Sequence, residues 1–251
     1  MPKPVNRARR AWRSLVPMPV RRALRAPLVG SPAQLAAARR DRPGPGTPRG
    51  INRLHVGCGP HNLMVDWWNV DIRGFAGIDQ VADVTQPWPW HDLDYVYGEH
   101  FLEHLPLDDA IRFLGQAAAG LRPDGRLRLS TPGLEWIWRT NFSPSGPDAE
   151  MVAMTYRVNR SFYGWGHRFL YSRPMLEHVL LGSGFTDLTF HRFGESPDPE
   201  LRGLEQHGGF DVVDSWPSVW IVEAVPAGTA STTALMAEAE HELERHRRSG
   251  H

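Results

Sequence analysis

Residues 54–62 read LHVGCGPHN, and this stretch decides which fold we expect. An apolar strand pattern runs directly into Gly57 and Gly59. Glycine lets the backbone turn tightly and approach a ligand closely, which a side chain would hinder. Open α/β sheets bind ligands beyond the carboxyl ends of their strands, where the connections diverge. The stretch therefore predicts a ligand site at the end of the first strand of such a sheet.

The glycine pattern differs from the fingerprint of dinucleotide-binding sites. Asn62 stands at the place of the third glycine, and Asp71 follows Gly57 by 14 residues, whereas a nicotinamide site expects an acidic residue after about 20. Nine residues separate Gly57 from Trp67, which is hardly enough for a full crossover helix. A pyrophosphate would need the N-terminus of that helix. The pattern thus favours a ligand without phosphate groups.

Beyond this stretch, strand patterns alternate with helix patterns. Apolar residues recur at spacings of three and four over residues 107–121, which predicts a helix. A second helix is expected at 173–184, after Ser172 and closed by glycine. The expected strands cover residues 51–57, 67–72, 94–97, 126–130, 185–193 and 218–225. This alternation, ending in a strand pair, predicts a mostly parallel α/β sheet.

Length and composition predict one substantial domain with additional arms. The chain has 251 residues, of which 41% are hydrophobic. Its single cysteine, Cys58, excludes an internal disulfide and a multi-cysteine zinc cluster, and it fits a reducing compartment. No apolar run approaches the roughly 18 residues of a membrane span. We therefore expect a cytoplasmic protein, soluble or at most attached to a membrane surface.

The first 50 residues differ in charge from the rest. They contain 12 Lys or Arg and one acidic residue, while the remaining chain has 16 basic and 27 acidic residues. We expect a basic arm and linker at 1–50, with a short helix at 33–40, the main domain at 51–226 and a helical tail at 227–251. The arm could dock on the body, contact anionic lipids or contact RNA, and it also resembles an organelle transit peptide. The tail could pack on the body or pair with another copy.

Six segments in order resemble the class I S-adenosylmethionine-dependent methyltransferases. They read LHVGCGP, WWNVDI, ADVTQPWPW, DYVYGEHFLEHL, LRPDGRLRLSTPG and HRFLYSRPMLEHVLLGSGF, and they span residues 53 to about 224. They most resemble small predicted members associated with glycan and secondary-metabolite pathways. The resemblance implies a Rossmann-like, mostly parallel sheet with an antiparallel last strand and helices on both faces. It also implies S-adenosyl-L-methionine as the cofactor.

The resemblance assigns residues to this cofactor. The expected cofactor-binding residues are Gly57, Cys58, Gly59, Asp71, Ile72, Asp83, Val84 and Glu99. Asp71 would accept hydrogen bonds from the ribose hydroxyls, and Asp83 would meet the adenine amino group. Two departures affect the expected affinity: His55 stands where the family usually has an acid, and Pro60-His61 replaces a glycine-tolerant turn.

Residues 100–104 read HFLEH, which matches the inverted zinc-peptidase pattern H-x-x-E-H. Here the segment begins at the end of a strand, and Pro106 soon interrupts the helix that follows. A zinc peptidase needs a longer helix that holds both histidines on one face and a third ligand downstream. We therefore expect no metal in this protein.

Methyl transfer to a hydroxyl group requires a proton acceptor. A histidine can take the proton at neutral pH. The catalytic candidates are His100, His167 and, next, Glu99. The acceptor pocket is expected in the aromatic-rich segment before residue 173, since aromatic faces suit a sugar ring or a planar metabolite. We expect O-methylation of a small-molecule or glycan-type acceptor.

Two alternatives of other classes stay open. An RNA-directed methyltransferase could use the basic arm, although nucleic acid is not the expected partner, because the Asn-Pro-Pro-Tyr type of segment used to methylate base amino groups is absent. A degenerate domain could bind the cofactor, or nothing, and act as a scaffold. Loss of Asp71 would abolish cofactor binding in the enzyme but would leave a scaffold's function intact.

Overall fold

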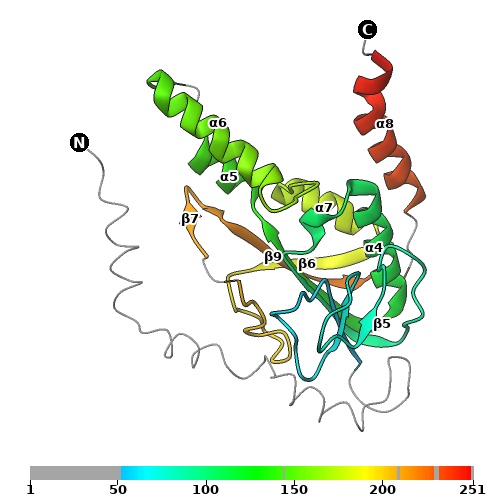
Figure 1. Cartoon of the computed structure of the whole chain (residues 1–251). Coiled ribbons are helices and arrows are strands. Elements are labelled where there is room, and N and C mark those ends of the chain that lie inside the picture. The colour runs from blue at the N-terminus through cyan, green and yellow to red at the C-terminus, as the bar shows by residue number, and fades with distance from the viewer. Residues whose placement is uncertain (1–51, 144, 208–209, 229–231, 250–251) are drawn as a thin grey trace, which may run out of the picture.

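The computed structural model describes residues 52–143, 145–207, 210–228 and 232–249 (Figure 1). The basic arm and the short helix expected at 33–40 lie outside these residues. Within them, seven strands form one sheet and a two-stranded hairpin, β7 (Val212–Val213) with β8 (Trp216–Pro217), stands apart. No helix in the described part of the chain combines the length and apolar character that crossing a membrane requires.

The sheet has the order β3-β2-β1-β4-β5-β9-β6. Its strands are β1 (Arg53–Val56), β2 (Trp68–Asp71), β3 (Gln80–Val81), β4 (Leu93–Glu99), β5 (Leu121–Pro132), β6 (Phe185–His191) and β9 (Val219–Pro226). The pairs from β3 to β5 are parallel, whereas β9 runs antiparallel to both β5 and β6. Since β9 is the last strand in the chain, the predicted mostly parallel sheet with an antiparallel last strand is confirmed.

The helices are η2 (Leu102–His104), α4 (Leu107–Gly120), α5 (Leu134–Asn141), α6 (Asp148–Tyr163), α7 (Arg173–Gly182) and α8 (Thr233–Ser249). The predicted helices correspond to α4, α7 and α8. Ser172 caps α7, because its hydroxyl accepts a hydrogen bond from the Met175 N–H at 3.3 Å. The sequence analysis did not predict α5 and α6, which occupy much of the aromatic-rich segment.

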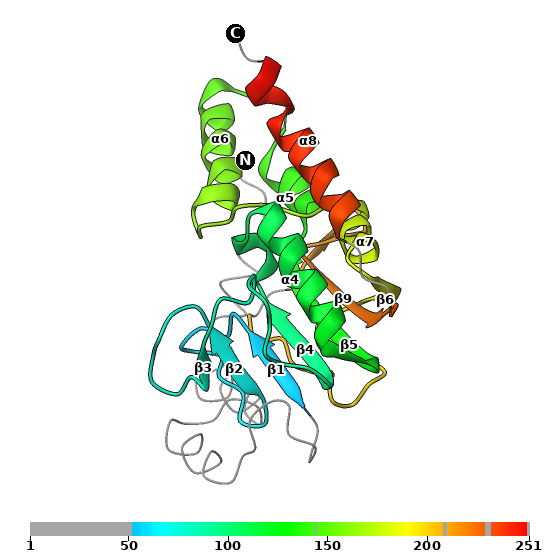
Figure 2. The ribbon, with the colours of Figure 1, turned by 90° about the vertical axis from the view of Figure 1, so that its right-hand side faces the viewer.

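One face of the sheet packs against helices. Leu54, Val56, Val96, Leu127 and Leu129 alternate along β1, β4 and β5 and join the main apolar core with residues of α4, α7 and α8. Figure 2 shows α4 lying over the strands, with the first turns of α8 near α4 and α7. The first half of α8 therefore packs on the body. This was one of the two expectations for the tail. Figure 1 shows its second half extending away from the sheet.

The opposite face lies under the segment 192–207, which has no helix. Leu201 and Leu204 of this segment pack with Met64, Trp67 and Tyr97 in a second apolar cluster. The eleven residues between β1 and β2 form turns and irregular structure, so no crossover helix stands there, as the short spacing predicted. The coverage of this face therefore depends on how the segment 192–207 is held in place.

A buried ion cluster holds that segment. Arg128 of β5 is fully buried, and its Nε donates to Glu205 Oε1 at 2.7 Å. Its guanidinium also pairs with Glu223 of β9 and donates to the carbonyl oxygen of Glu195 at 3.0 Å. Burial alone would lower the pKa of Arg128, but the two carboxylates outweigh it and raise that pKa. The cluster thus ties residues 195 and 205 to two strands of the sheet.

His55 lies on the same face of the sheet and is buried. Its Nδ1 lies 3.3 Å from Asn69 Oδ1, and its ring centroid lies 5.1 Å from that of Tyr97. Burial lowers the pKa of His55 to about 4. The imidazole at this position is therefore neutral at physiological pH.

This lowered pKa predicts a dependence of stability on pH. Below about pH 6.5 the unfolded chain protonates His55, whereas the folded chain does so only near pH 4. The free energy of unfolding should therefore fall by about 3 kcal/mol from this residue alone as the pH drops through this window. Urea unfolding at several pH values should show a shallower fall for His55→Gln. The variant His91→Gln, at an exposed histidine, is the control, and equal slopes for both would contradict the assignment.

Candidate functional site

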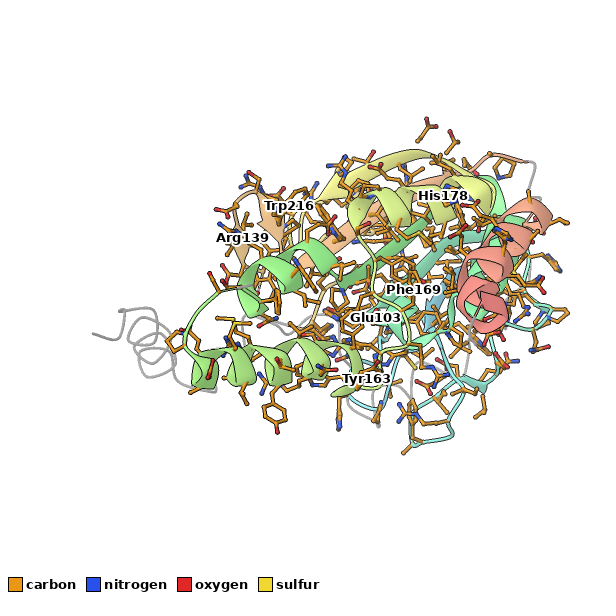
Figure 3. All side chains as sticks on the ribbon, turned by 90° about the horizontal axis from the view of Figure 1, so that it is seen from above. Glu103, Arg139, Tyr163, Phe169, His178 and Trp216 are labelled. Carbon is orange, nitrogen blue, oxygen red and sulfur yellow. The ribbon has the colours of Figure 1, made fainter. Side chains whose placement is uncertain are left out.

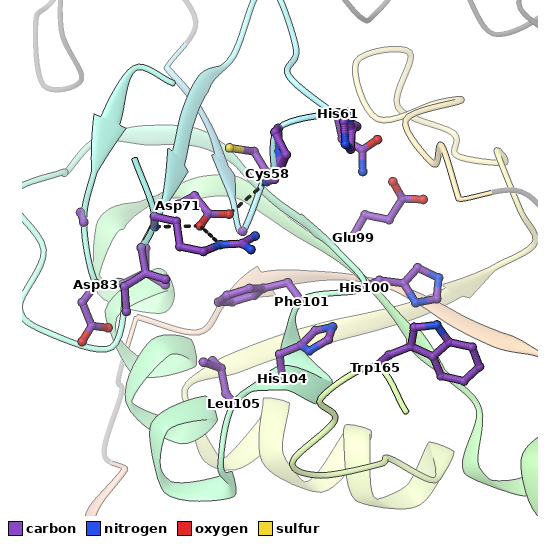
Figure 4. Close-up of a pocket in the computed structure, with 18 of the residues that line it drawn as sticks. Cys58, His61, Asp71, Asp83, Glu99, His100, Phe101, His104, Leu105 and Trp165 are labelled. Atoms are coloured by element: carbon purple, nitrogen blue, oxygen red, sulfur yellow. Dashed lines mark hydrogen bonds and ion pairs between the residues drawn. The ribbon is translucent and has the colours of Figure 1, made fainter. Parts of the chain in front are cut away.

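A cavity of about 640 Å³ lies at the carboxyl ends of β1, β2 and β4 (Figure 4). Its walls contain all eight residues predicted to bind the cofactor, namely Gly57, Cys58, Gly59, Asp71, Ile72, Asp83, Val84 and Glu99. Of the catalytic candidates, His100 also lines it, whereas His167 does not. In Figure 4, Asp71 and Asp83 stand on one side of the cavity, and His100, His104 and Trp165 stand on the other.

The two glycines at the end of β1 have backbones in the left-handed region. Their φ angles are +60° for Gly57 and +57° for Gly59, which other residues adopt only with strain. A Cβ on Gly57 would lie 2.3 Å from Phe101 Cδ2, while one on Gly59 would meet no atom within 4 Å. The Phe101 ring thus excludes any side chain at position 57. The backbone at Gly59 faces open space that a ligand can fill.

Asp71 ends β2 with a carboxylate fixed by its own backbone neighbours. Oδ2 accepts a hydrogen bond from the Gly59 N–H at 3.0 Å, and Oδ1 accepts one from the Arg73 N–H at 2.9 Å (Figure 4). Oδ1 also accepts a long hydrogen bond, 3.4 Å, from Nε of the exposed Arg73 side chain. A carboxylate oxygen has two lone pairs, so Oδ2, with its one bond from Gly59, keeps a lone pair for a ligand donor. Ile72, beside it, is 67% exposed and offers an apolar surface to the cavity. This pair can accept from a diol and cover a flat ring.

Asp83 follows β3 and is ionised. Its Oδ1 accepts hydrogen bonds from the Thr85 hydroxyl at 2.7 Å and from the Thr85 N–H at 3.0 Å. These bonds lower the pKa of Asp83. The second oxygen can accept from an amino group, while Val84 is a buried apolar neighbour.

Cys58 contributes its backbone rather than a reactive thiol. Its side chain is buried against Leu63, Val65 and Phe75. Burial raises the pKa of the thiol to about 12, so it is neutral and a poor nucleophile near neutral pH.

Glu99 ends β4 and is occupied by a segment distant in the sequence. Its Oε1 accepts from the backbone N–H groups of Gln206 and His207 at 2.7 and 2.8 Å, and Oε2 lies 3.1 Å from His207 Nδ1. Burial would raise the pKa of Glu99, but the hydrogen bonds from His207 and Gln206 outweigh it and lower that pKa. A carboxylate stabilised in this way is a weak proton acceptor, so Glu99 is better suited to hold residues 206–207 at the cavity rim.

A second cavity of about 670 Å³ adjoins the first. The two share the side chains of His100, His104, Trp165 and His207. Trp136 and Ile137 of α5, Arg160 and Ser161 of α6, and His167 line the second cavity alone. The aromatic-rich segment thus supplies its walls through Trp136 and Trp165. Other aromatic residues of that segment point elsewhere, since Tyr163 at the end of α6 is 75% exposed (Figure 3).

His100 stands between the two cavities in an unusual backbone conformation. Its φ is +47°, in the left-handed region, where such residues cluster at functional sites. Its Nδ1 lies 3.1 Å from Oε1 of Glu103, which is fully buried. The other oxygen of Glu103 accepts from the Thr131 hydroxyl at 3.0 Å. Glu103 is therefore held on both oxygens, and it orients the His100 ring.

His167 is fixed by a backbone carbonyl. Its Nδ1 lies 2.7 Å from the carbonyl oxygen of Ser161, so Nδ1 carries the proton and Nε2 has the lone pair. Burial lowers the pKa of His167, although that carbonyl opposes it. The ring centroids of His167 and His104 lie 5.1 Å apart.

Sequence reasoning missed three residues of this region. His207 left no local signal, because it reaches Glu99 from more than 100 residues away. Glu103 and His104 did have a signal, since both belong to the H-x-x-E-H pattern, but the prediction assigned them only to the start of a helix. The structure shows a single turn, η2, at that place.

One family of known proteins matches the sequence of this chain. A family model described as a methyltransferase domain matches residues 31–189. No curated protein matches the sequence.

Three solved structures to which the chain is similar are methyltransferases. Phosphoethanolamine N-methyltransferase 2 from Haemonchus contortus, in complex with S-adenosyl-L-methionine, is 14% identical with a TM-score of 0.43 over 79% of this chain and 53% of that one. A SAM-dependent methyltransferase from Archaeoglobus fulgidus is 18% identical, with a TM-score of 0.43 over 78% and 95%. A possible histamine N-methyltransferase from Thermotoga maritima is 13% identical, with a TM-score of 0.44 over 76% and 86%. The chain spans about half the length of the first of these.

Proposed function

The chain belongs to the class I S-adenosylmethionine-dependent methyltransferase family, and we propose that it methylates a hydroxyl group of a small-molecule or glycan-type acceptor. The observation that carries this proposal is the pair of adjoining cavities that share His100, His104, Trp165 and His207. One cavity offers the groups that the cofactor requires. The other offers space for an acceptor next to it.

The first cavity fits the cofactor through its own residues. The open backbone at Gly59 leaves room for the methionine part. We assign the ribose hydroxyls to Asp71 and the adenine amino group to Asp83, because each carboxylate keeps an oxygen lone pair for a donor. Bound S-adenosyl-L-methionine supplies a methyl group on a positively charged sulfur. The task left to the protein is to align the acceptor and to remove its proton.

The second cavity has features that suit a hydroxylated acceptor. Trp136 lines this cavity, and its Nε1 is a buried donor without a hydrogen-bond partner among the described residues. A turn of the ring toward the cavity would let an acceptor oxygen pair with Nε1. The ring of Trp165 is 64% exposed and lies at the boundary of both cavities, where it can stack on a sugar or a planar ring.

We assign the role of general base to His100. Glu103 holds its Nδ1, so a neutral ring has its lone pair on Nε2, the nitrogen that accepts a proton. His167 also keeps an Nε2 lone pair, but it lines only the second cavity. His100 is therefore the better placed of the two predicted histidines.

The variant His100→Asn should lower kcat by about 10²- to 10⁴-fold, which is the usual contribution of a general base, and should leave cofactor affinity unchanged. Asparagine is chosen because it tolerates a positive φ. Transfer of a labelled methyl group should be measured first on a panel of sugars and hydroxylated metabolites, then with the variant. His178→Asn, at an exposed histidine on α7, is the control. Full kcat in His100→Asn would remove the base assignment, and turnover of amines alone would contradict O-methylation.

The RNA-directed alternative and the membrane contact both depend on the basic arm at residues 1–50, which lies outside the described residues. The domain boundaries and the cytoplasmic location stay predictions. No feature of the described residues favours a scaffold over an enzyme.

A further inference from the structure

Three ligand-type side chains converge at the boundary of the two cavities. One ligand atom each from Glu103, His104 and His167 lie within 4.8 Å of one another. The first two belong to η2, directly after β4, and His167 follows α6. The sequence pattern H-x-x-E-H paired Glu103 with two histidines of the same segment. The folded chain instead brings a histidine from a different segment to Glu103 and His104.

The hydrogen bonds around this cluster prepare its members as metal ligands. The Ser161 carbonyl holds the proton of His167 on Nδ1 at 2.7 Å, which leaves Nε2 for a metal. The Thr131 hydroxyl donates to Glu103 Oε2 at 3.0 Å, and His100 lies at Oε1. Metal-binding histidines and carboxylates usually have such outer partners, which fix tautomer and orientation.

The charge of Glu103 is the second argument. Its side chain is completely buried, and its ion-pair partner among the described residues is His100, a histidine. A buried carboxylate is costly unless a cation compensates it. Two imidazoles and one carboxylate form a donor set that suits Zn²⁺ and related divalent transition metals.

We propose that Glu103, His104 and His167 bind one divalent transition-metal ion, with Zn²⁺ as the preferred species. Zinc lies about 2.0–2.2 Å from nitrogen and oxygen ligands, so atoms that now lie within 4.8 Å of one another need to move inward by about 1 Å or less. This proposal revises the sequence-based expectation of no metal. Two of the ligands, Glu103 and His104, come from the HFLEH segment. His100 is not a ligand but contacts the ligand Glu103.

The position of the ion defines what it would do. All three ligands line the second cavity, and His104 also lines the first. Three protein ligands leave at least one position for water or an acceptor oxygen, as in catalytic zinc sites. Such an ion lowers the pKa of a bound hydroxyl, beside the base His100. This role rests on the proposed function, whereas metal binding itself does not.

Metal binding is tested on the full chain after removal of metals with a chelator. Elemental analysis after equilibration with Zn²⁺ should give one ion per chain, and Co²⁺ should give visible absorption bands with the same stoichiometry. His104→Ala and His167→Ala should each weaken binding by more than about 100-fold, since loss of an outer partner alone costs 10- to 100-fold. Thr131→Val should fall in that smaller range. His104 is exposed, so its variant is expected to keep the fold.

His178→Ala is the matched control, because His178 also lies 3.1 Å from a glutamate, Glu238, but on the surface. It should bind Zn²⁺ like the unmodified chain. Absence of stoichiometric binding, or full affinity in both His104→Ala and His167→Ala, would overturn the metal site and indicate a hydrogen-bonded histidine network instead. Titration of the same preparations with S-adenosyl-L-methionine reports on the proposed function separately, so either proposal can fail alone.

Discussion

Asp71→Ala is expected to weaken binding of S-adenosyl-L-methionine by at least about 100-fold. Hydrogen bonds to a charged group contribute about 1.5–3 kcal/mol each, and the proposed site loses two of them with the ribose. A loss of about 3 kcal/mol corresponds to more than 100-fold in affinity. The variant also frees the Gly59 N–H, which Asp71 now fixes at 3.0 Å, so the loop at the end of β1 loses its anchor.

Calorimetric titration with S-adenosyl-L-methionine and with S-adenosylhomocysteine measures this loss. Asp71→Asn separates the effect of charge from that of shape, because the amide keeps one acceptor oxygen. Its affinity for S-adenosyl-L-methionine should lie between that of the unmodified chain and that of Asp71→Ala. Asp66→Ala, at an exposed aspartate near β2 that does not line the cavity, should bind like the unmodified chain. An Asp71→Ala variant that folds and binds within a few-fold of normal would show that the ribose lies elsewhere.

The second large effect concerns stability. Arg128→Met should lower the free energy of unfolding by about 3–5 kcal/mol, the usual cost of removing one partner from a buried ion pair. The Arg128 side chain is fully buried and pairs with both Glu205 and Glu223. Its removal leaves these two buried carboxylates without the positive charge of its guanidinium. Urea unfolding measures the change.

A matched control stands two residues earlier on the same strand. Arg126 lies 3.8 Å from Asp198 but is 40% exposed, so Arg126→Met should cost about 1 kcal/mol or less. Adding Glu205→Gln and Glu223→Gln to Arg128→Met should recover part of the loss, because neutral groups need no compensating charge. Equal destabilisation by Arg126→Met and Arg128→Met would contradict the buried cluster.

The residues predicted for the cofactor follow local sequence rules more closely than the rest of the two cavities does. Gly57, Gly59 and Asp71 depend on local rules, a tight turn and a carboxylate at a strand end, and these rules act over a few residues. Arg128 follows no such rule. In the strand pattern RLRLS it resembles a solvent-facing residue, and only the packing of a segment 77 residues away turns that position into a buried one.

The second cavity shows the same limit. The aromatic residues before α7 predicted a pocket, but their helical arrangement in α5 and α6 decides which of them face it. Trp136 lines the second cavity, whereas Tyr156 is 75% exposed on α6. His100 was predicted at a strand exit, yet its φ of +47° and its contact with Glu103 arise from the turn into η2, which no pattern of letters specifies.

The segment 192–207 separates two tasks along a short piece of chain. Residues 195 and 205 fasten it to the sheet through Arg128, while the next two residues reach Glu99 and the cavity rim. Because residues 205 and 206 are neighbours in the chain, loss of the Arg128 anchor should also draw the N–H groups of Gln206 and His207 away from Glu99. The shape of the cavity rim thus depends on a charge buried on the neighbouring strand.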